Sequence, residues 1–314
     1  MKSLKIVFMG TPDFAVASLR KLVESNYKVV GVITAPDRPA GRGQKLRASA
    51  VKEYALSVGL TIMQPTNLKS EDFLTELKAL DADLQIIVAF RMLPKVVWAM
   101  PKQGTFNLHA SLLPQYRGAA PINWAIINGE KITGNTTFFI DEKIDTGSII
   151  LQQQVEISPL VTAGDLHDEL MNNGANLVLE TVDLIEEGKL TTVPQPDLES
   201  KTAYKLTKEN TKIDWSLSGE KIHNLIRGLS PYPSAWCFLN DKNKQQKIKI
   251  FLTEFERTNH SENLGAISVS EKQLKVAVND GYICIQKMQL PGKKAVLTKA
   301  LLNGYTFDEN AFMV

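Results

Sequence analysis

The stretch LKIVFMGTPDFAVASLRKLVES, residues 4–25, decides the fold class. Residues 4–9 form an apolar run typical of a buried strand, and Gly10-Thr11-Pro12-Asp13 is a turn that leads into a helix over residues 14–25. A strand that enters a helix through a short turn is the first half of a βαβ unit. The turn lacks the pattern G-x-G-x-x-G, and Pro12 removes a backbone N–H that could bind a pyrophosphate. We therefore expect a Rossmann-like fold without the signature of a nicotinamide enzyme.

The same alternation of strands and helices continues through the first part of the chain. Apolar strand patterns and helical patterns follow one another in turn, which favours right-handed crossovers and a parallel sheet. Gly188 is a plausible end for the last helix of this series. The elements are expected at residues 27–34, 48–58, 61–63, 70–80, 84–90 and 163–187. The prediction is an α/β fold: a mainly parallel sheet with helices on both faces.

The pattern changes in the last third of the chain. A helix near residues 220–227 precedes several short strands within about a hundred residues, a density typical of a small β-barrel. Asn279-Asp280-Gly281 is a hairpin turn signal between two of these strands. We expect an OB-like barrel. The predicted domains are a catalytic domain at residues 1–189, a linker at 190–205 and a C-terminal barrel at 206–314.

Bulk properties limit the class of protein. With 314 residues, 44% hydrophobic and 22% charged, the chain has the composition of a globular protein of two domains. The two cysteines, Cys237 and Cys284, offer neither a disulfide framework nor metal spacing, and we find no signal peptide or membrane span, so we expect a cytoplasmic protein. Residues 206–314 hold 15 Lys and Arg against 11 Asp and Glu, which weakly favours a polyanionic partner for that part of the chain.

Polar residues gather at the end of one apolar strand. In FNLHASLLP, residues 106–114, Asn107 and His109 are two positions apart and should project from the same face of a strand. An amide donor suits a developing oxyanion, and a histidine suits proton transfer near neutral pH. Asp145, in a turn after a strand expected at residues 135–140, is a candidate to orient the imidazole. Without the setting of a nucleophile elbow, direct carbonyl transfer to a second substrate fits best. From spacing alone, satisfied core polar residues remain an equal alternative.

Longer motifs carry a specific resemblance. NLHASLLPQYRGAAPINWA, residues 107–125, resembles the signature of the folate-dependent formyltransferases. DTG at residues 145–147 resembles the catalytic aspartate motif of that family, and AFRMLP at residues 89–94 resembles its folate-pocket strand. The stretches GTPDFA, APDRPAGRGQKL and IRGLSPYPSAW are similar to the branch of the family that acts on methionyl-initiator tRNA. The resemblance extends over the whole chain.

The resemblance implies a reaction and roles for the polar residues. The formyl group of 10-formyltetrahydrofolate would pass to the α-amino group of methionine carried by the initiator tRNA. Asn107 would bind the oxyanion, and His109 would help to stabilise the oxyanion and would transfer protons. Asp145 would fix the imidazole tautomer and favour the charged form of the ring. No metal is implied. The folate site would be lined by Ser111, Leu112, Leu113 and Pro114, with backbone groups near Arg91, Met92 and Leu93 at the pterin edge.

The same resemblance implies two tRNA-binding regions. The basic segment at residues 37–52 would enter the acceptor arm, through the cations Arg38, Arg42, Lys45 and Arg47, and Lys52 adds to its charge. In the C-terminal region, Lys287, Lys293 and Lys294 would contact the inner side of the tRNA. Without the resemblance, a solvated surface loop would be the better interpretation of the basic segment, and ordinary surface lysines would explain the second group equally well.

Three alternatives remain from other classes of acceptor or protein. A stand-alone amino-sugar nucleotide N-formyltransferase would share the chemistry, but the basic segment and the barrel-like tail speak against it. A non-catalytic RNA-binding module would have no need of Asn107, His109 and Asp145. A nicotinamide oxidoreductase is disfavoured by the absent glycine pattern. We expect a monomeric enzyme with no membrane partner.

Overall fold

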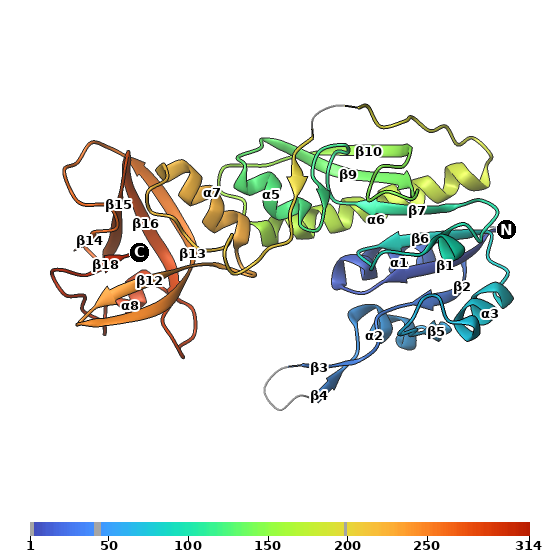
Figure 1. Ribbon diagram of the computed structural model, residues 1–314, viewed down its shortest axis with the longest axis horizontal. Helices are drawn as coiled ribbons and strands as arrows, with labels where there is room; N and C mark the ends of the chain where they lie inside the picture. The colour runs from blue at the N-terminus through green and yellow to red at the C-terminus, as the bar shows by residue number, and fades with distance from the viewer. Residues whose placement is uncertain (1–2, 41–44, 198–199) are drawn as a thin grey trace. The chain divides into compact units, whose positions relative to one another are not determined.

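The computed structural model describes residues 3–40, 45–197 and 200–314, and the chain divides into two compact units (Figure 1). The first unit comprises Met1–Gly118, Thr133–Glu156 and His167–Thr202. The second comprises Ala119–Ile132, Ile157–Leu166 and Ala203–Val314. The predicted domain boundaries at residues 189 and 206 stay a prediction.

The first unit contains a seven-stranded sheet in the order β10-β9-β7-β6-β1-β2-β5. The pairs β1–β2, β1–β6, β6–β7 and β2–β5 are parallel, whereas β7–β9 is antiparallel. The strands are β1 (Lys5–Gly10), β2 (Lys28–Ile33), β5 (Ile62–Met63), β6 (Leu84–Val88), β7 (Thr105–His109), β9 (Ile132–Phe139) and β10 (Ile149–Glu156). The predicted Rossmann-like, mainly parallel sheet is confirmed.

Helices cover both faces of this sheet, because successive side chains of each strand point to opposite faces. On one face Val7, Met9 and Ile87 pack with Phe73 and Leu77 of α3 in one buried cluster. On the other face α6 approaches so closely that a Cβ at Gly174 would lie 2.8 Å from a methyl group of Leu108. The helices around this sheet are α1 (Asp13–Glu24), α2 (Ala50–Ser57), α3 (Glu71–Ala79), α4 (Lys95–Trp98) and α6 (Ala163–Glu186).

The basic segment is a hairpin rather than the polar loop that the sequence predicts. Strands β3 (Arg38–Ala40) and β4 (Lys45–Arg47) pair antiparallel, with Arg38 opposite Arg47, and extend away from the sheet (Figure 1). Backbone pairing satisfies the N–H and C=O groups of a segment that would otherwise be only solvated. Arg42 lies outside the described residues. Two further short strands, β8 (Arg117–Gly118) and β11 (Thr202–Ala203), lie outside the large sheet.

The second unit contains the antiparallel barrel. Its sheet runs β14-β15-β16-β13-β12-β18, and a bridge between Ala266, next to β14, and Phe312 of β18 nearly closes it. Inward-facing residues such as Ile248, Ile250 and Ile283 form its core with Ile222 and Ile226 of α7. The elements are α5 (Pro121–Ile127), α7 (Gly219–Leu229), β12 (Ala235–Asp241), β13 (Lys244–Arg257), β14 (Ile267–Ser270), β15 (Gln273–Val278), β16 (Gly281–Gln289), β17 (Val296–Leu297), α8 (Thr298–Leu301) and β18 (Phe312–Met313). The predicted C-terminal barrel is confirmed.

No helix within the described ranges has the length and apolarity that a membrane crossing requires.

Candidate active site

Asn107 and His109 lie on β7, and each is paired with a residue of a neighbouring strand. Asn107 is opposite Ile87 of β6, and His109 is opposite Thr136 of β9. His109 is buried, with 6% of its surface exposed, whereas Asn107 is half-buried. Among the residues that the structure describes, none forms a hydrogen bond with the Asn107 side chain. Its amide is therefore available to a ligand.

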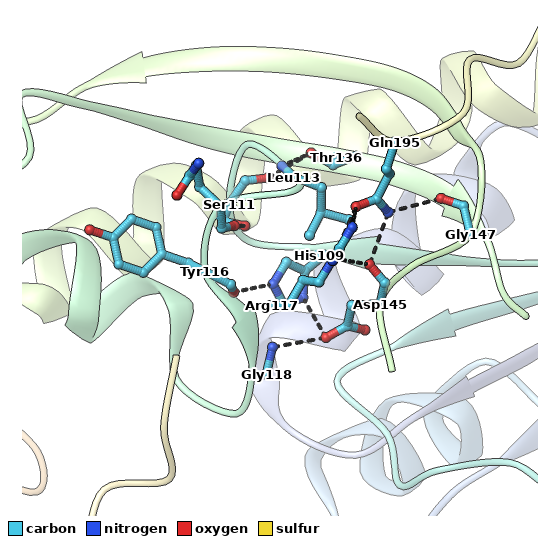
Figure 2. Close-up of polar contacts among 11 residues, drawn as sticks. His109, Ser111, Leu113, Tyr116, Arg117, Gly118, Thr136, Asp145, Gly147 and Gln195 are labelled. Atoms are coloured by element: carbon cyan, nitrogen blue, oxygen red, sulfur yellow. Dashed lines mark hydrogen bonds and ion pairs between the residues drawn. The ribbon is translucent and has the colours of Figure 1, made fainter. Parts of the chain in front are cut away.

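The tautomer of His109 follows from one hydrogen bond. Its Nε2 lies 2.8 Å from the backbone carbonyl oxygen of Tyr116. A carbonyl oxygen can only accept, so Nε2 carries the hydrogen and donates it, which leaves Nδ1 of the neutral ring as a proton acceptor. Nδ1 lies 3.9 Å from Asp145 Oδ2, too far for a direct hydrogen bond but close enough for an ion pair once the ring is charged (Figure 2). The Tyr116 carbonyl, rather than the expected Asp145, fixes the tautomer.

Asp145 lies in a tight turn between β9 and β10. Its backbone has a φ of +55°, a left-handed conformation that is uncommon outside glycine. Its Oδ2, the oxygen that faces the imidazole, accepts a hydrogen bond of 2.9 Å from the backbone N–H of Gly118. The side chain is 17% exposed, so the carboxylate is largely screened from water. This geometry brings Asp145 together with His109, as the sequence predicts.

Gly147 makes the turn possible. A Cβ at this position would lie 1.6 Å from the carbonyl oxygen of Phe139, which no side chain can do. The same turn is tied internally by Asp141, whose Oδ1 accepts from the Lys143 N–H at 2.9 Å and from the Thr146 hydroxyl at 2.7 Å. Turn geometry thus sets the position of Asp145 from both sides.

The four residues predicted to line the folate site fall into two groups. Ser111 and Leu113 are buried and hold their own loop, since Ser111 Oγ donates to the Gln115 carbonyl at 2.6 Å and Leu113 N–H donates to Thr136 Oγ1 at 3.1 Å. Leu112 and Pro114 are half-buried and retain surface that a ligand could meet. The Ser111 hydroxyl and the backbone N–H of Leu113 therefore fix the shape of this loop.

The segment after β6 presents backbone instead of side chains. In the described part of the chain, residues 90–93 form no backbone hydrogen bond, so their N–H and C=O groups are free for a partner. Leu93 is buried in the core below, and Met92 is 74% exposed. The Arg91 guanidinium donates to the carbonyls of Pro65 and Thr66, which accounts for a side chain whose role the sequence left open. Burial, and then the charge of Arg38, lower the pKa of Arg91.

The basic hairpin carries exposed cations. Arg38 and Arg47 are exposed and form no ion pair with any described residue, while Lys45 begins β4. Lys52 differs from them, because its Nζ donates to Asp37 Oδ2 at 2.7 Å. The hydrogen bond from Lys52 and another from Gln64 lower the pKa of the Asp37 carboxyl. Lys52 therefore supports the base of the hairpin.

The C-terminal lysines belong to the second unit. Lys287 is half-buried on β16, opposite Leu297 of β17. Lys293 and Lys294 are exposed in the turn between these strands, which is closed by a hydrogen bond from the Gln289 amide to the Lys293 carbonyl. No described acid pairs with any of the three. Their relation to a tRNA stays a prediction.

Sequence reasoning missed three residues of this site. Tyr116 and Arg117 lie inside the quoted motif, but the motif does not reveal which groups they contact. Tyr116 contacts His109 through its backbone carbonyl. Gln195 lies between two prolines in the predicted linker, where nothing in the sequence distinguishes it from a residue of a connecting segment. Among the described residues, no cluster of three or more His, Cys, Asp or Glu could hold a metal ion.

Comparisons with known proteins find matching families and similar structures. Residues 4–182 match the formyl transferase family, and residues 205–306 match the formyl transferase C-terminal domain. Among solved structures, a sugar 3N-formyl transferase has a TM-score of 0.66 at 23% identity, covering 93% of this chain and 99% of that one. Glycinamide ribonucleotide transformylase 1 from Symbiobacterium toebii has a TM-score of 0.52 at 21% identity, covering 62% of this chain and 94% of that one. These two likenesses concern the fold.

Curated relatives are much closer in sequence. Methionyl-tRNA formyltransferase from Flavobacterium johnsoniae is 60% identical over 99% of this chain and 99% of its own. The protein of the same name from Bacteroides fragilis is 51% identical over 98% of this chain and 97% of its own. The chain belongs to the formyl transferase family and, within it, to the methionyl-tRNA formyltransferases.

Proposed function

We propose that the chain transfers the formyl group of 10-formyltetrahydrofolate to the α-amino group of methionyl-initiator tRNA, by direct attack of the amine. The observation that supports this most is the His109 ring, with Nε2 bound to a carbonyl and Nδ1 facing a carboxylate 3.9 Å away. That arrangement can take a proton and stabilise the resulting charge. The formation of formylmethionyl-tRNA for translation initiation would place the enzyme in the cytoplasm, and we expect it to act as a monomer.

The chemical step uses three side chains. The neutral amine attacks the formyl carbon, a C–N bond forms, and the formyl oxygen becomes an oxyanion. The unpaired Asn107 amide donates to this oxygen, which in comparable sites stabilises the transition state by roughly 3–4 kcal/mol. His109 Nδ1 accepts a proton from the attacking nitrogen, and the Asp145 carboxylate offsets the positive charge on the ring. When the bond to N10 of the folate breaks, His109 returns the proton to N10.

The formyl donor is expected to lie against the segment after β6. A pterin ring presents donors and acceptors along one edge, and the free backbone groups of residues 90–93 can match them. Leu112 and Pro114 offer apolar surface from the loop that follows β7. The roles of Ser111, Leu113 and Arg91 in this proposal are indirect. The side chains of Ser111 and Arg91 already donate hydrogen bonds to backbone carbonyls, and the side chain of Leu113 is buried.

The tRNA is expected to meet the basic hairpin with its acceptor arm. Arg38 and Arg47 carry charge that no described acid neutralises, which suits phosphate groups. Lys287, Lys293 and Lys294 are proposed to contact the backbone of the same tRNA from the second unit. No observation favours a sugar acceptor, because the likeness to sugar formyltransferases concerns only the fold.

The test compares acceptors under identical conditions. Formyl transfer from 10-formyltetrahydrofolate is measured with methionyl-initiator tRNA, with an amino-sugar nucleotide and with no acceptor. We expect transfer to the charged tRNA alone. Equal or faster transfer to the sugar nucleotide would overturn the proposed acceptor, and release of formate without an acceptor would indicate a hydrolase.

A further inference from the structure

Gln195 is not the free linker residue that its sequence context indicates. Two residues earlier, Val193 exchanges two backbone hydrogen bonds with Ile149, of 2.8 and 2.9 Å, at the start of β10. The segment therefore runs along the edge of the first unit, and Gln195 points into the turn that carries Asp145 (Figure 2). Its side chain is half-buried there.

The amide of Gln195 uses both its donor and its acceptor ends. Its Nε2 donates to the backbone carbonyls of Asp145, at 2.9 Å, and Gly147, at 2.8 Å. Its Oε1 accepts from Arg117 Nη2 at 2.6 Å and from Arg117 Nε at 3.1 Å. Arg117 Nε also donates to the Asp145 carbonyl at 3.0 Å (Figure 2). The Asp145 carbonyl thus has two donors from residues remote in sequence.

These contacts stabilise an unfavourable backbone conformation. A φ of +55° is a conformation that non-glycine residues adopt uncommonly, and contacts with the surrounding chain stabilise it. Arg117 and Gln195 fix the carbonyl of Asp145, and the N–H of Gly118, the residue next to Arg117, fixes its Oδ2. Arg117 and Gly118 therefore hold the backbone and the carboxylate of Asp145 from one short stretch of chain, and Gln195 adds a second contact to the backbone.

The position of the Arg117 charge is informative. Its guanidinium binds a backbone carbonyl and an amide oxygen, and within the described ranges no ion pair joins it to the Asp145 carboxylate. A direct ion pair would compete with a charged His109 ring for the same carboxylate. Binding the carbonyl instead leaves the negative charge of Asp145 for His109.

We propose that Gln195 and Arg117 are positioning residues for the Asp145 carboxylate and act on formyl transfer only through it. The inference rests on the proposed function, because it requires Asp145 to support His109 during the chemical step. A misplacement of about 1 Å at such a group can lower a rate on the order of 100-fold. The alternative, that Gln195 only fastens the connecting segment, predicts a loss of stability without a specific loss of rate.

The experiment begins with three single variants of the full chain. Gln195→Glu keeps the length of the side chain and the acceptor for Arg117 but places an oxygen against two carbonyls. Gln195→Met removes all polar contacts at similar length, which controls for the added charge. Gln154→Glu, at an exposed glutamine of β10, is the matched control. Single-turnover rates, the KM for each substrate and melting temperatures are measured for each.

Both Gln195 variants should lower the single-turnover rate by about 10- to 100-fold. The KM for tRNA and the KM for the formyl donor should stay within twofold, and the control should match the wild type. Normal rates in both Gln195 variants would overturn the inference, as would a loss of rate that follows only the loss of folded protein.

A double variant decides whether the effect passes through Asp145. Residues that act through one group have non-additive effects. In an Asp145→Asn background, Gln195→Met should cost less than threefold more, whereas independent losses that multiply would contradict the proposal. A nearly normal rate for Asp145→Asn alone would overturn the proposed role of Asp145 and this inference with it. A slow Asp145→Asn beside normal Gln195 variants would overturn the inference alone.

Discussion

The site around Asp145 and the basic hairpin β3–β4 are both polar, yet different contacts hold their charged groups. Around Asp145, the side chains of the reacting groups bind backbone atoms: His109 the Tyr116 carbonyl and Asp145 the Gly118 N–H, while Gln195 binds the Asp145 carbonyl. At the base of the hairpin, the Asp37 carboxylate accepts from the side chains of Lys52 and Gln64, and Gln64 also donates to the Ala35 carbonyl. The outer cations of the hairpin, Arg38 and Arg47, have no described acidic partner.

The difference follows from what each region has to do. A reacting group must keep its geometry to a fraction of an ångström, and a backbone atom is the least mobile partner available. Attraction of a polyanion acts over about 8–10 Å at ordinary salt and tolerates a range of positions. We therefore expect substitutions in the turn to change rates, and substitutions in the hairpin to change binding.

His109→Ala should have the largest effect. Without the imidazole, no group at this position takes the proton from the amine, and the single-turnover rate should fall by about 10²- to 10⁴-fold. The KM for tRNA should change little. Added imidazole should restore part of the rate. A rate within threefold of the wild type would show that His109 does not serve proton transfer.

Asn107→Ala should lower the rate by about 10²- to 10³-fold through loss of an oxyanion donor. Asn176→Ala, at an exposed asparagine of α6, is the matched control and should leave the rate unchanged. Single-turnover kinetics with saturating tRNA measure both. If Asn107→Ala instead raises the KM for tRNA and leaves the rate unchanged, Asn107 serves tRNA binding and not the chemical step.

Gly147→Ala should lower the rate by roughly 100-fold, because the new Cβ would force the turn away from Phe139 and displace Asp145. Gly304→Ala is the control, since a Cβ there meets nothing within 4 Å. Rates and melting temperatures are compared for the two. An active Gly147→Ala would mean that the carboxylate tolerates displacement, and the contrast with the hairpin would be lost.

Arg38→Gln and Arg47→Gln should each raise the KM for tRNA several-fold and leave the single-turnover rate at saturation unchanged. Each should also reduce the slope of log KM against log salt concentration by about 1 if it contacts a phosphate. Lys52→Gln, which removes a charge already paired with Asp37, should leave that slope as it is. A slope that falls equally in all three would contradict the distinction between binding cations and the base of the hairpin.

The smallest effect concerns acid stability. The pKa of Asp37 is lowered in the folded protein, first by its hydrogen bond with Lys52. The stabilisation is therefore complete above the ordinary pKa of an aspartate, about 4, and is lost as pH falls below it. The free energy of unfolding should fall less steeply between pH 5 and 3 in Asp37→Asn than in the wild type. Identical pH profiles would mean that this ion pair contributes nothing.

The sequence predicted the elements that depend on side-chain pattern. The apolar run of β1, the 163–187 helix and the barrel strands are visible because burial imposes a period on residue type. Alternation along β7 placed Asn107 and His109 on one face, and the motif at residues 145–147 added Asp145. The basic segment was predicted as a loop because its two strands are only three residues each.

The contacts that the sequence could not predict are those that end on backbone atoms. Any residue type could supply the carbonyl that binds His109 Nε2, so the identity of Tyr116 as a tyrosine does not indicate this contact. Gln195 donates to the carbonyl of Asp145, 50 positions earlier, and that approach depends on how the connecting segment pairs with the start of β10. Such contacts are properties of the folded backbone.

The return of this segment also limits how the enzyme can be divided. A fragment cut at residue 189, where the sequence predicts the linker to begin, would lack the Val193 pairing and Gln195. Its parallel sheet could still assemble, yet the Asp145 carboxylate would be positioned less accurately relative to His109. An excised catalytic piece, or a chimaera with a foreign RNA-binding tail, should therefore keep the chain through Thr202, the last residue of the first unit.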